Sequence, residues 1–196
     1  LERELEIARE VQRELLPRAV PEVRGLQLAG VCLPAVGVGG DLYDFLPFSE
    51  DRVGLVIADV SGKGIPAALL MAGLQASIRS LALPSLPPAE LNRRLNVMLC
   101  RSTAAARYAT LFFGFFDGRA RTLTYSNAGH YPPLWFRTGA GAFSEITANG
   151  IPVGILPGQT YQEETIQLAP RDLLVLYTDG VIEARAENGE MFGVER

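Results

Sequence analysis

One continuous stretch, Gly54–Met71, constrains the fold of the chain more than any other segment. It opens with the apolar run Leu55–Ala58, whose length after a glycine is typical of a buried strand. Asp59 follows that run, and a glycine-containing turn then leads to Pro66, a residue that favours the first turn of a helix. Because an unpaired buried carboxylate is costly, Asp59 at the end of an apolar strand requires a partner.

Two further carboxylates lie upstream, in the glycine-rich segment Val36–Phe45, which reads VGVGGDLYDF. The glycines do not form a dinucleotide-binding motif, because the third glycine of that motif would fall on Leu42. Asp41 and Asp44 are compatible with cation binding and also with a solvated turn, and this segment alone does not decide between them.

A hairpin relates the two segments. We expect a strand over residues 42–48 to pair in antiparallel fashion with residues 53–58, through a turn at residues 49–52. In such a hairpin the start of the first strand lies beside the end of the second. Asp41 and Asp59, distant in sequence, are therefore predicted to converge at one end of the sheet.

A third acid follows the same pattern near the end of the chain. The apolar run Leu173–Tyr177 leads into Thr178, Asp179 and a glycine. One such acid would be an ordinary turn residue, but Asp41, Asp59 and Asp179 all lie at strand ends beside glycines. The sequence therefore predicts a shared cation site, and carboxylates with backbone carbonyls suit Mg²⁺ or Mn²⁺.

Other catalytic arrangements are excluded or weak. The only histidine is His130, which excludes a His-Glu-x-x-His zinc site. Ser61 does not lie in a serine-nucleophile elbow, because position 59 is Asp. Lys63 is followed by Gly64, so the phosphate-binding Walker motif also fails. His130, in NAGHYPP, is either a structural residue that is hydrogen-bonded in a tight turn or a general acid.

The N-terminal segment, residues 1–16, is predicted to form a helix that ends at Pro17. Its apolar stripe has coiled-coil-like spacing and contains one polar member, Gln12. Two heptads are too few to decide the role of this helix. It is a helix packed on its own domain, the end of a helical linker from an upstream domain, or a dimer seam. The stripe comprises Leu1, Leu5, Ala8, Gln12 and Leu15.

The remaining elements indicate an α+β fold. A strand is expected over residues 26–33, a long helix over 64–83 and a second helix over 89–102. Gly73 in the long helix marks either a close packing contact or a hinge. Strand-length runs then occupy residues 108–117, 121–128, 133–136, 162–168 and 172–179.

Composition limits the function classes further. The 196 residues suffice for one domain, and a net charge of −4 argues against a general nucleic-acid binder. No apolar run is long enough to span a membrane, and no signal peptide is present. Cys32 and Cys100 are interpreted as small buried residues of a reducing compartment, so we expect a cytoplasmic protein. The start at Leu1 without Met indicates a piece of a longer chain.

Four segments together resemble one family: VGGDLYDF, LVIADVSGKGIPAALLM, SNAGHYPPL and LLVLYTDGVIEARAENGEMFG. In order and spacing they are similar to the stage II sporulation protein E-like phosphatases, a bacterial branch of the metal-dependent PPM serine/threonine phosphatases. The resemblance implies a layered αββα sandwich, with two central antiparallel sheets flanked by helices, and an Mn²⁺ or Mg²⁺ pair. Asp59 matches the ligand that bridges both metals, Val60 a carbonyl ligand, and Asp41 and Asp179 further ligands, whereas Asp44 lies outside the ligand set.

The resemblance also implies a biological setting. Family substrates are phosphorylated anti-anti-sigma proteins with STAS domains, and many members carry a sensor domain upstream of a helix like residues 1–16. In the family pattern, the phosphatase domain at residues 17–196 would continue into a further strand with a last metal-ligand Asp, which this chain lacks. The alternatives are therefore a catalytically weak binding module, or a dimeric signalling element, that retains the fold.

Overall fold

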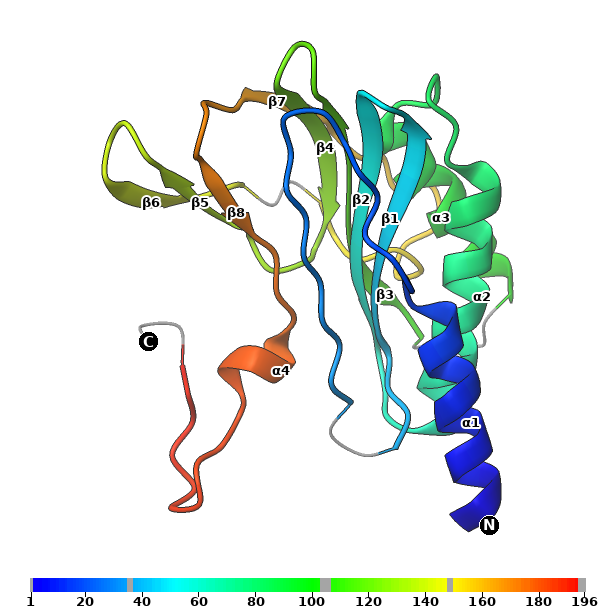
Figure 1. Ribbon diagram of the computed structural model, residues 1–196. Helices are drawn as coiled ribbons and strands as arrows, with labels where there is room; N and C mark the ends of the chain where they lie inside the picture. Colours follow the sequence, from blue (N-terminus) through cyan, green and yellow to red (C-terminus); the bar gives the residue numbers. More distant parts are fainter. Residues whose placement is uncertain (1, 35–36, 103–106, 148–149, 194–196) are drawn as a thin grey trace.

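The fold is built on a five-stranded antiparallel sheet whose strands lie in the order β1-β2-β3-β4-β7 (Figure 1). The computed structural model describes residues 2–34, 37–102, 107–147 and 150–193. The strands of this sheet are β1 (Asp41–Ser49), β2 (Arg52–Val60), β3 (Ala109–Asp117), β4 (Thr122–Ala128) and β7 (Glu164–Gln167).

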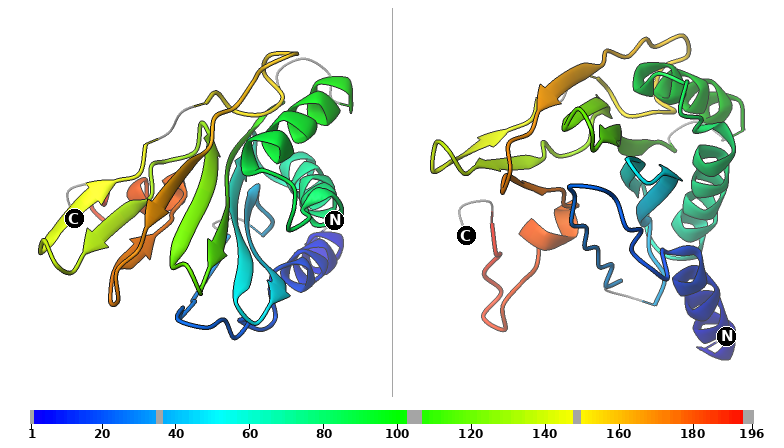
Figure 2. Two further views of the ribbon diagram at one scale, coloured as in Figure 1. Left: turned by 90° about the horizontal axis from the view of Figure 1, so that it is seen from above. Right: turned by 45° about the horizontal axis from the view of Figure 1, so that its top comes forward.

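Three helices cover one face of this sheet, and a smaller antiparallel sheet lies on the side away from them (Figure 2). The predicted α+β class with two antiparallel sheets and flanking helices is thereby confirmed. The helices are α1 (Glu2–Leu15), α2 (Ile65–Leu81) and α3 (Pro88–Ser102); the small sheet, in the order β6-β5-β8, contains β5 (Leu134–Arg137), β6 (Ala142–Glu145) and β8 (Leu173–Val175); and α4 (Asp179–Ile182) follows it.

The central strands β2 and β3 are buried on both faces, which explains their nearly continuous apolar sequences. Val56 and its cross-strand partner Phe113 belong to the core between sheet and helices. Ile57 and Phe112, one position along, belong to a second core between the two sheets. Because side chains alternate across a strand, one apolar pair of strands supports both layers.

The hairpin expected from the sequence is confirmed, but the strand predicted over residues 26–33 is wrong. The segment forms a single bridge, between Val23 and Leu26, and none of its later residues joins a ladder. Leu28 packs against the core between the sheets, while Val31 and Leu33 are 76% and 85% exposed. The apolar alternation thus reflects packing on one side without a strand to pair with.

Two further sequence-based expectations concern the cysteines and the end of the chain. Cys32 and Cys100 are free thiols, as expected, but both are half-buried and not fully buried. The expected absence of a final strand and Asp concerns the end of the chain, where residues 194–196 lie outside the described residues.

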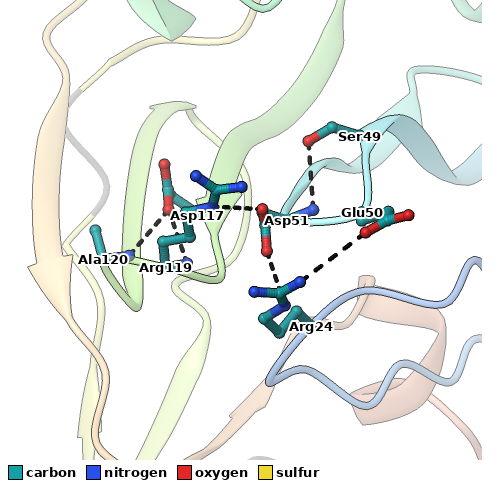
Figure 3. Close-up of polar contacts among 7 residues, drawn as sticks. All are labelled: Arg24, Ser49, Glu50, Asp51, Asp117, Arg119 and Ala120. Atoms are coloured by element: carbon teal, nitrogen blue, oxygen red, sulfur yellow. Dashed lines mark hydrogen bonds and ion pairs between the residues drawn. The ribbon is translucent and has the colours of Figure 1, made fainter.

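At one end of the large sheet, Asp51 joins three segments of the chain (Figure 3). Its carboxylate is ion-paired with Arg24, at 3.1 Å, and with Arg119 of the β3–β4 turn. The Asp51 carbonyl also accepts a hydrogen bond from the Gly118 amide at 2.7 Å. These contacts hold the turn of the β1–β2 hairpin against Arg24 and the β3–β4 turn.

Gly73 in α2 does not mark a close packing contact, because a Cβ atom placed there meets no atom within 4 Å. We expect Gly73→Ala to raise the free energy of unfolding by about 1 kcal/mol, since alanine restricts the unfolded chain and favours the helix. Urea unfolding measures this change. A loss of stability in the variant would show that the glycine has a conformational role.

Candidate metal centre

Asp41 and Asp59 face each other across the β1–β2 ladder, at the end of the hairpin away from its turn. This confirms the predicted convergence of the two carboxylates. The pairing continues one step further, since the Val60 amide donates a hydrogen bond to the Gly40 carbonyl at 3.3 Å. The backbone around both acids is therefore held by hydrogen bonds on the strand side.

Gly40 lies so close to β2 that no side chain fits there. A Cβ atom at this position would stand 2.5 Å from the Val60 carbonyl oxygen and 3.4 Å from Oδ1 of Asp59. A contact of 2.5 Å is far inside van der Waals distance, so any other residue must displace the Val60 carbonyl. The glycine before Asp41 thus leaves room for the Val60 carbonyl and the Asp59 carboxylate beside it.

Helix α4 carries further acids whose charges reach this end of the hairpin. Asp179 is its first residue, and the preceding Thr178 side chain forms a hydrogen bond with Asp41. Asp179 acts electrostatically on both Asp41 and Asp59, and Glu183 acts on Asp59. Sequence reasoning missed Glu183, although its spacing of four from Asp179 puts both on one side of a helical turn.

The gathered carboxylates repel one another. Burial first, and then the charges of Asp41, Asp179 and Glu183, raise the pKa of Asp59 to about 7. Burial also raises the pKa of Asp41, with Asp179 adding to the effect and the Thr178 hydrogen bond opposing it. Like charges held together in this way are relieved by a cation, and carboxylate and carbonyl oxygens are the donors that Mg²⁺ and Mn²⁺ prefer.

These residues supply the oxygen donors that such a cation needs, but they do not form a complete metal-binding cluster. Within the described ranges, no three acidic, histidine or cysteine side chains are close enough together to constitute a metal-binding cluster. Asp41 and Asp59 are fixed on the rigid hairpin, whereas Asp179 is carried by a separate short helix. The pairing of Asp41 with Asp59 agrees with the sequence prediction, whereas Asp179 does not form a cluster of three with them. The roles of these acids as ligands belong to the proposal below.

Asp44 lies on the other face of β1 from Asp41, because an interval of three residues reverses the direction of a strand side chain. It is 1% exposed and faces α2. Its Oδ2 accepts hydrogen bonds from Nε of Arg79 at 2.6 Å and from Nε2 of Gln75 at 3.2 Å. Asp44 is therefore committed to the contact between β1 and α2, away from the other acids.

His130 is 2% exposed and supports the strands next to the site. Its Nδ1 lies 2.8 Å from Oγ1 of Thr110, the cross-strand partner of Asp59. Burial lowers the pKa of His130 to about 4, against a smaller opposing effect of the Tyr177 backbone. A buried histidine that is neutral near pH 7 is suited to a structural role and not to the role of a general acid.

Solved structures with a PP2C-type fold align with the chain. The SiaA PP2C domain of Pseudomonas aeruginosa aligns with a TM-score of 0.78 over 100% of this chain and 78% of that chain, at 22% identity. RsbX, solved in complex with magnesium, aligns with a TM-score of 0.61 over 74% of this chain and 68% of that chain, at 19% identity. The fold is therefore that of the PP2C class.

Sequence comparison is more specific. The profile of the family described as stage II sporulation protein E (SpoIIE) matches residues 49–196. The phosphoserine phosphatase RsbU of Bacillus subtilis (strain 168) is 33% identical over 186 residues, which are 95% of this chain and 55% of RsbU. The chain belongs to the SpoIIE family. It spans about half the length of the curated relatives it matches.

Proposed function

We propose that this chain carries a metal-dependent phosphatase activity that hydrolyses phosphoserine or phosphothreonine in a protein. The observation that carries the proposal is the pairing of Asp41 with Asp59 at the end of the β1–β2 hairpin, where Asp179 lies near enough to raise the pKa of both. Family membership supports it, since the relative RsbU is named a phosphoserine phosphatase. The magnesium complex of the fold relative RsbX supports a divalent cation.

In this proposal each residue has a separate task. By the family resemblance, Asp59 would be the ligand shared by two Mn²⁺ or Mg²⁺ ions, and Asp41 and Asp179 would be further ligands. The Val60 carbonyl is a further ligand, kept accessible by Gly40. Bound there, a divalent cation pair supplies an activated water and neutralises the charge of the phosphoryl oxygens.

We infer that the substrate is a phosphorylated regulatory protein of the STAS-domain, anti-anti-sigma type. The family resemblance supports this inference, and it also supports a cytoplasmic protein in which α1 joins the domain to an upstream sensor. Ile7 and Val11 on α1 are more than half exposed, which is compatible with a helical dimer seam. No helix within the described residues has the length and apolar character needed to cross a membrane.

Hydrolysis of a small aryl phosphate with added Mn²⁺ tests the activity without knowledge of the substrate. We expect phosphate release that requires Mn²⁺, stops with EDTA and returns when Mn²⁺ is in excess. A phosphoserine peptide then tests the substrate class. Failure of both substrates at saturating Mn²⁺ would contradict the proposal and favour a binding module that retains the fold.

Gly40→Ala should weaken Mn²⁺ binding at least about tenfold, because the new methyl group displaces the Val60 carbonyl. Gly39→Ala is the matched control, since a Cβ there meets its nearest atom at 3.9 Å. Calorimetric titration with Mn²⁺ measures both variants. Equal affinities for the two would show that the close approach of residue 40 to Val60 has no role in binding.

The raised pKa of Asp59 predicts a pH effect in the metal-free protein. The folded state binds the Asp59 proton more tightly than the unfolded state, where the pKa is about 4, so this residue's contribution to stability falls from about pH 4 to about pH 7. We expect Asp59→Asn to stabilise the protein, relative to wild type, more at about pH 8 than at about pH 5. Urea unfolding in EDTA measures this; an equal gain at both pH values would contradict it.

A further inference from the structure

His130, the only histidine of the chain, lies in a rigid turn at residues 127–131. Asn127 binds both backbone groups of His130: its Nδ2 donates to the His130 carbonyl at 3.1 Å, and the His130 amide donates to its Oδ1 at 2.8 Å. A Cβ atom at Gly129 would stand 2.5 Å from Cδ of Pro152, so the turn also packs closely against its neighbour. The imidazole therefore starts from a fixed backbone position.

The contacts of Nδ1 assign the tautomer of the His130 ring. Nδ1 lies 2.8 Å from Oγ1 of Thr110, whose other acceptor, the Asp59 carbonyl, is at 3.5 Å. Because the hydroxyl favours the shorter contact, it donates to Nδ1, and a neutral ring then carries its proton on Nε2. His130 is thus a buried N–H donor on the nitrogen that does not bind Thr110.

This donor has no acceptor. Among the residues that the structure describes, none forms a hydrogen bond with Nε2 of His130, although the atom is buried. A buried donor without an acceptor is costly, and each such group calls for an explanation. The Tyr177 backbone lies close enough to oppose the lowering of the His130 pKa, as a carbonyl acceptor does. The Tyr177 carbonyl is therefore the acceptor that a small movement brings to Nε2.

The connection between β8 and α4, residues 176–178, leads the chain to Asp179. It lies outside the ladder that β8 forms with β5. Within it, the Tyr177 ring packs against the ring of Tyr131, with 5.6 Å between their centroids. Tyr131 directly follows His130, so the rigid turn contacts the connection two residues before Asp179. How closely Asp179 approaches the hairpin therefore depends in part on this turn.

Two incomplete contacts meet at this connection. Asp179 does not form a close metal-binding cluster with Asp41 and Asp59 in the described part of the chain. The histidine Nε2 has no acceptor, although it lies near the backbone that leads to Asp179. Thr110, which binds the ring, is the cross-strand partner of Asp59, so closure of Asp179 on the hairpin acids brings the connection toward the side on which the ring is held. One movement then completes both contacts.

We propose that His130 is a positioning residue of the cation site, whose Nε2–H donates to the Tyr177 carbonyl when Asp179 closes on the hairpin acids. The inference rests on the proposed function, because it concerns how the third acid reaches the same site. It gives the buried histidine a task distinct from that of a general acid, since the ring passes no proton to the substrate and holds the connection that carries Asp179.

The single histidine gives one set of ring signals in a nitrogen-15 NMR spectrum of the full chain. Mg²⁺ is the added cation because it is diamagnetic, and calorimetry establishes its saturating concentration. In EDTA we expect a neutral ring with its proton on Nε2. Saturating Mg²⁺ should shift this proton downfield and slow its exchange with water, since it enters a hydrogen bond. Ring signals that do not respond to saturating Mg²⁺ overturn the inference.

Two substitutions at position 130 separate the two ring nitrogens. The amide nitrogen of His130→Gln reaches the position of Nε2, whereas the side chain of His130→Asn ends near that of Nδ1. His130→Asn should bind Mn²⁺ about tenfold more weakly than wild type, as for other residues that support metal ligands indirectly, and His130→Gln should recover most of this affinity. The paramagnetic resonance signal of free Mn²⁺ gives each affinity, and thermal unfolding shows that each variant is folded.

Asn92→Leu is the matched control, because Asn92 is another fully buried polar side chain that binds β4, through Ser126. It should lose thermal stability without a change in Mn²⁺ affinity. Equal affinities in His130→Asn and His130→Gln, or an equal loss in His130→Asn and Asn92→Leu, overturn the positioning role and leave the phosphatase proposal intact. Absence of cation binding by the wild type overturns the proposed function and this inference with it. If neither variant at position 130 folds, the NMR measurement on the wild type decides.

Discussion

Asp59→Asn is expected to abolish Mn²⁺-dependent phosphate release, with a loss greater than the roughly 100-fold that accompanies changes to residues beyond the metal ligands. Asp59 is the acid on which the charges of Asp41, Asp179 and Glu183 converge. Asparagine keeps the shape of the side chain and removes the negative charge that a shared ligand needs. Initial rates with an aryl phosphate at several Mn²⁺ concentrations measure the effect.

Asp117→Asn provides the matched control, since it makes the same chemical change on the same sheet. Asp117 lies at the end of β3 by the Arg119 turn, and its Oδ1 accepts backbone hydrogen bonds that an asparagine oxygen can also accept. This variant should retain wild-type activity. If Asp59→Asn were as active as Asp117→Asn, the assignment of the site would be wrong.

Arg79→Met is expected to lower the free energy of unfolding by about 3 kcal/mol or more, because it leaves a buried charge without its cationic partner. The side chain of Asp44 is 2% exposed, and Arg79 binds both of its oxygens, at 2.6 and 3.2 Å. The neutral Gln75 amide, which remains, cannot compensate a full negative charge. Urea unfolding gives the stability of the variant.

Two further variants identify the cause of this loss. Adding Asp44→Asn to Arg79→Met removes the uncompensated charge and should recover much of the stability. Arg94→Met, which breaks an exposed ion pair with Glu90, should cost less than about 1 kcal/mol. A similar cost for Arg79→Met and Arg94→Met would show that burial of Asp44 contributes little.

The sequence was sufficient for the elements with strong periodicity or clear ends. The hairpin that joins Asp41 to Asp59 follows from two apolar runs and one tight turn, and the structure has the same pairing. Asp179, after the run at residues 173–177, lies near enough to act on Asp41 and Asp59, but it is the first residue of α4 and β8 ends earlier, at Val175. For the hairpin, two apolar strands and the short turn between them determine the geometry.

Contacts between segments that are distant in the sequence were harder to predict from local patterns. Asp44 and Arg79 are 35 residues apart, and no local pattern pairs them. Gln12 had the spacing of an apolar stripe, but its two hydrogen bonds with the Gly39 backbone depend on how α1 docks against the loop before β1. The segment at residues 26–33 had the alternation of a strand, yet a ladder also needs a partner with free backbone groups, which local sequence does not reveal.

The most direct measurement of the central claim is Mn²⁺ binding, observed by the loss of the free-ion paramagnetic resonance signal, in wild type, Asp59→Asn and Asp117→Asn. We predict that wild type and Asp117→Asn bind Mn²⁺ with equal affinity, and that Asp59→Asn has lost most of this affinity. If all three proteins bind Mn²⁺ equally, or if none binds it, the carboxylates at the end of the β1–β2 hairpin are not a cation site.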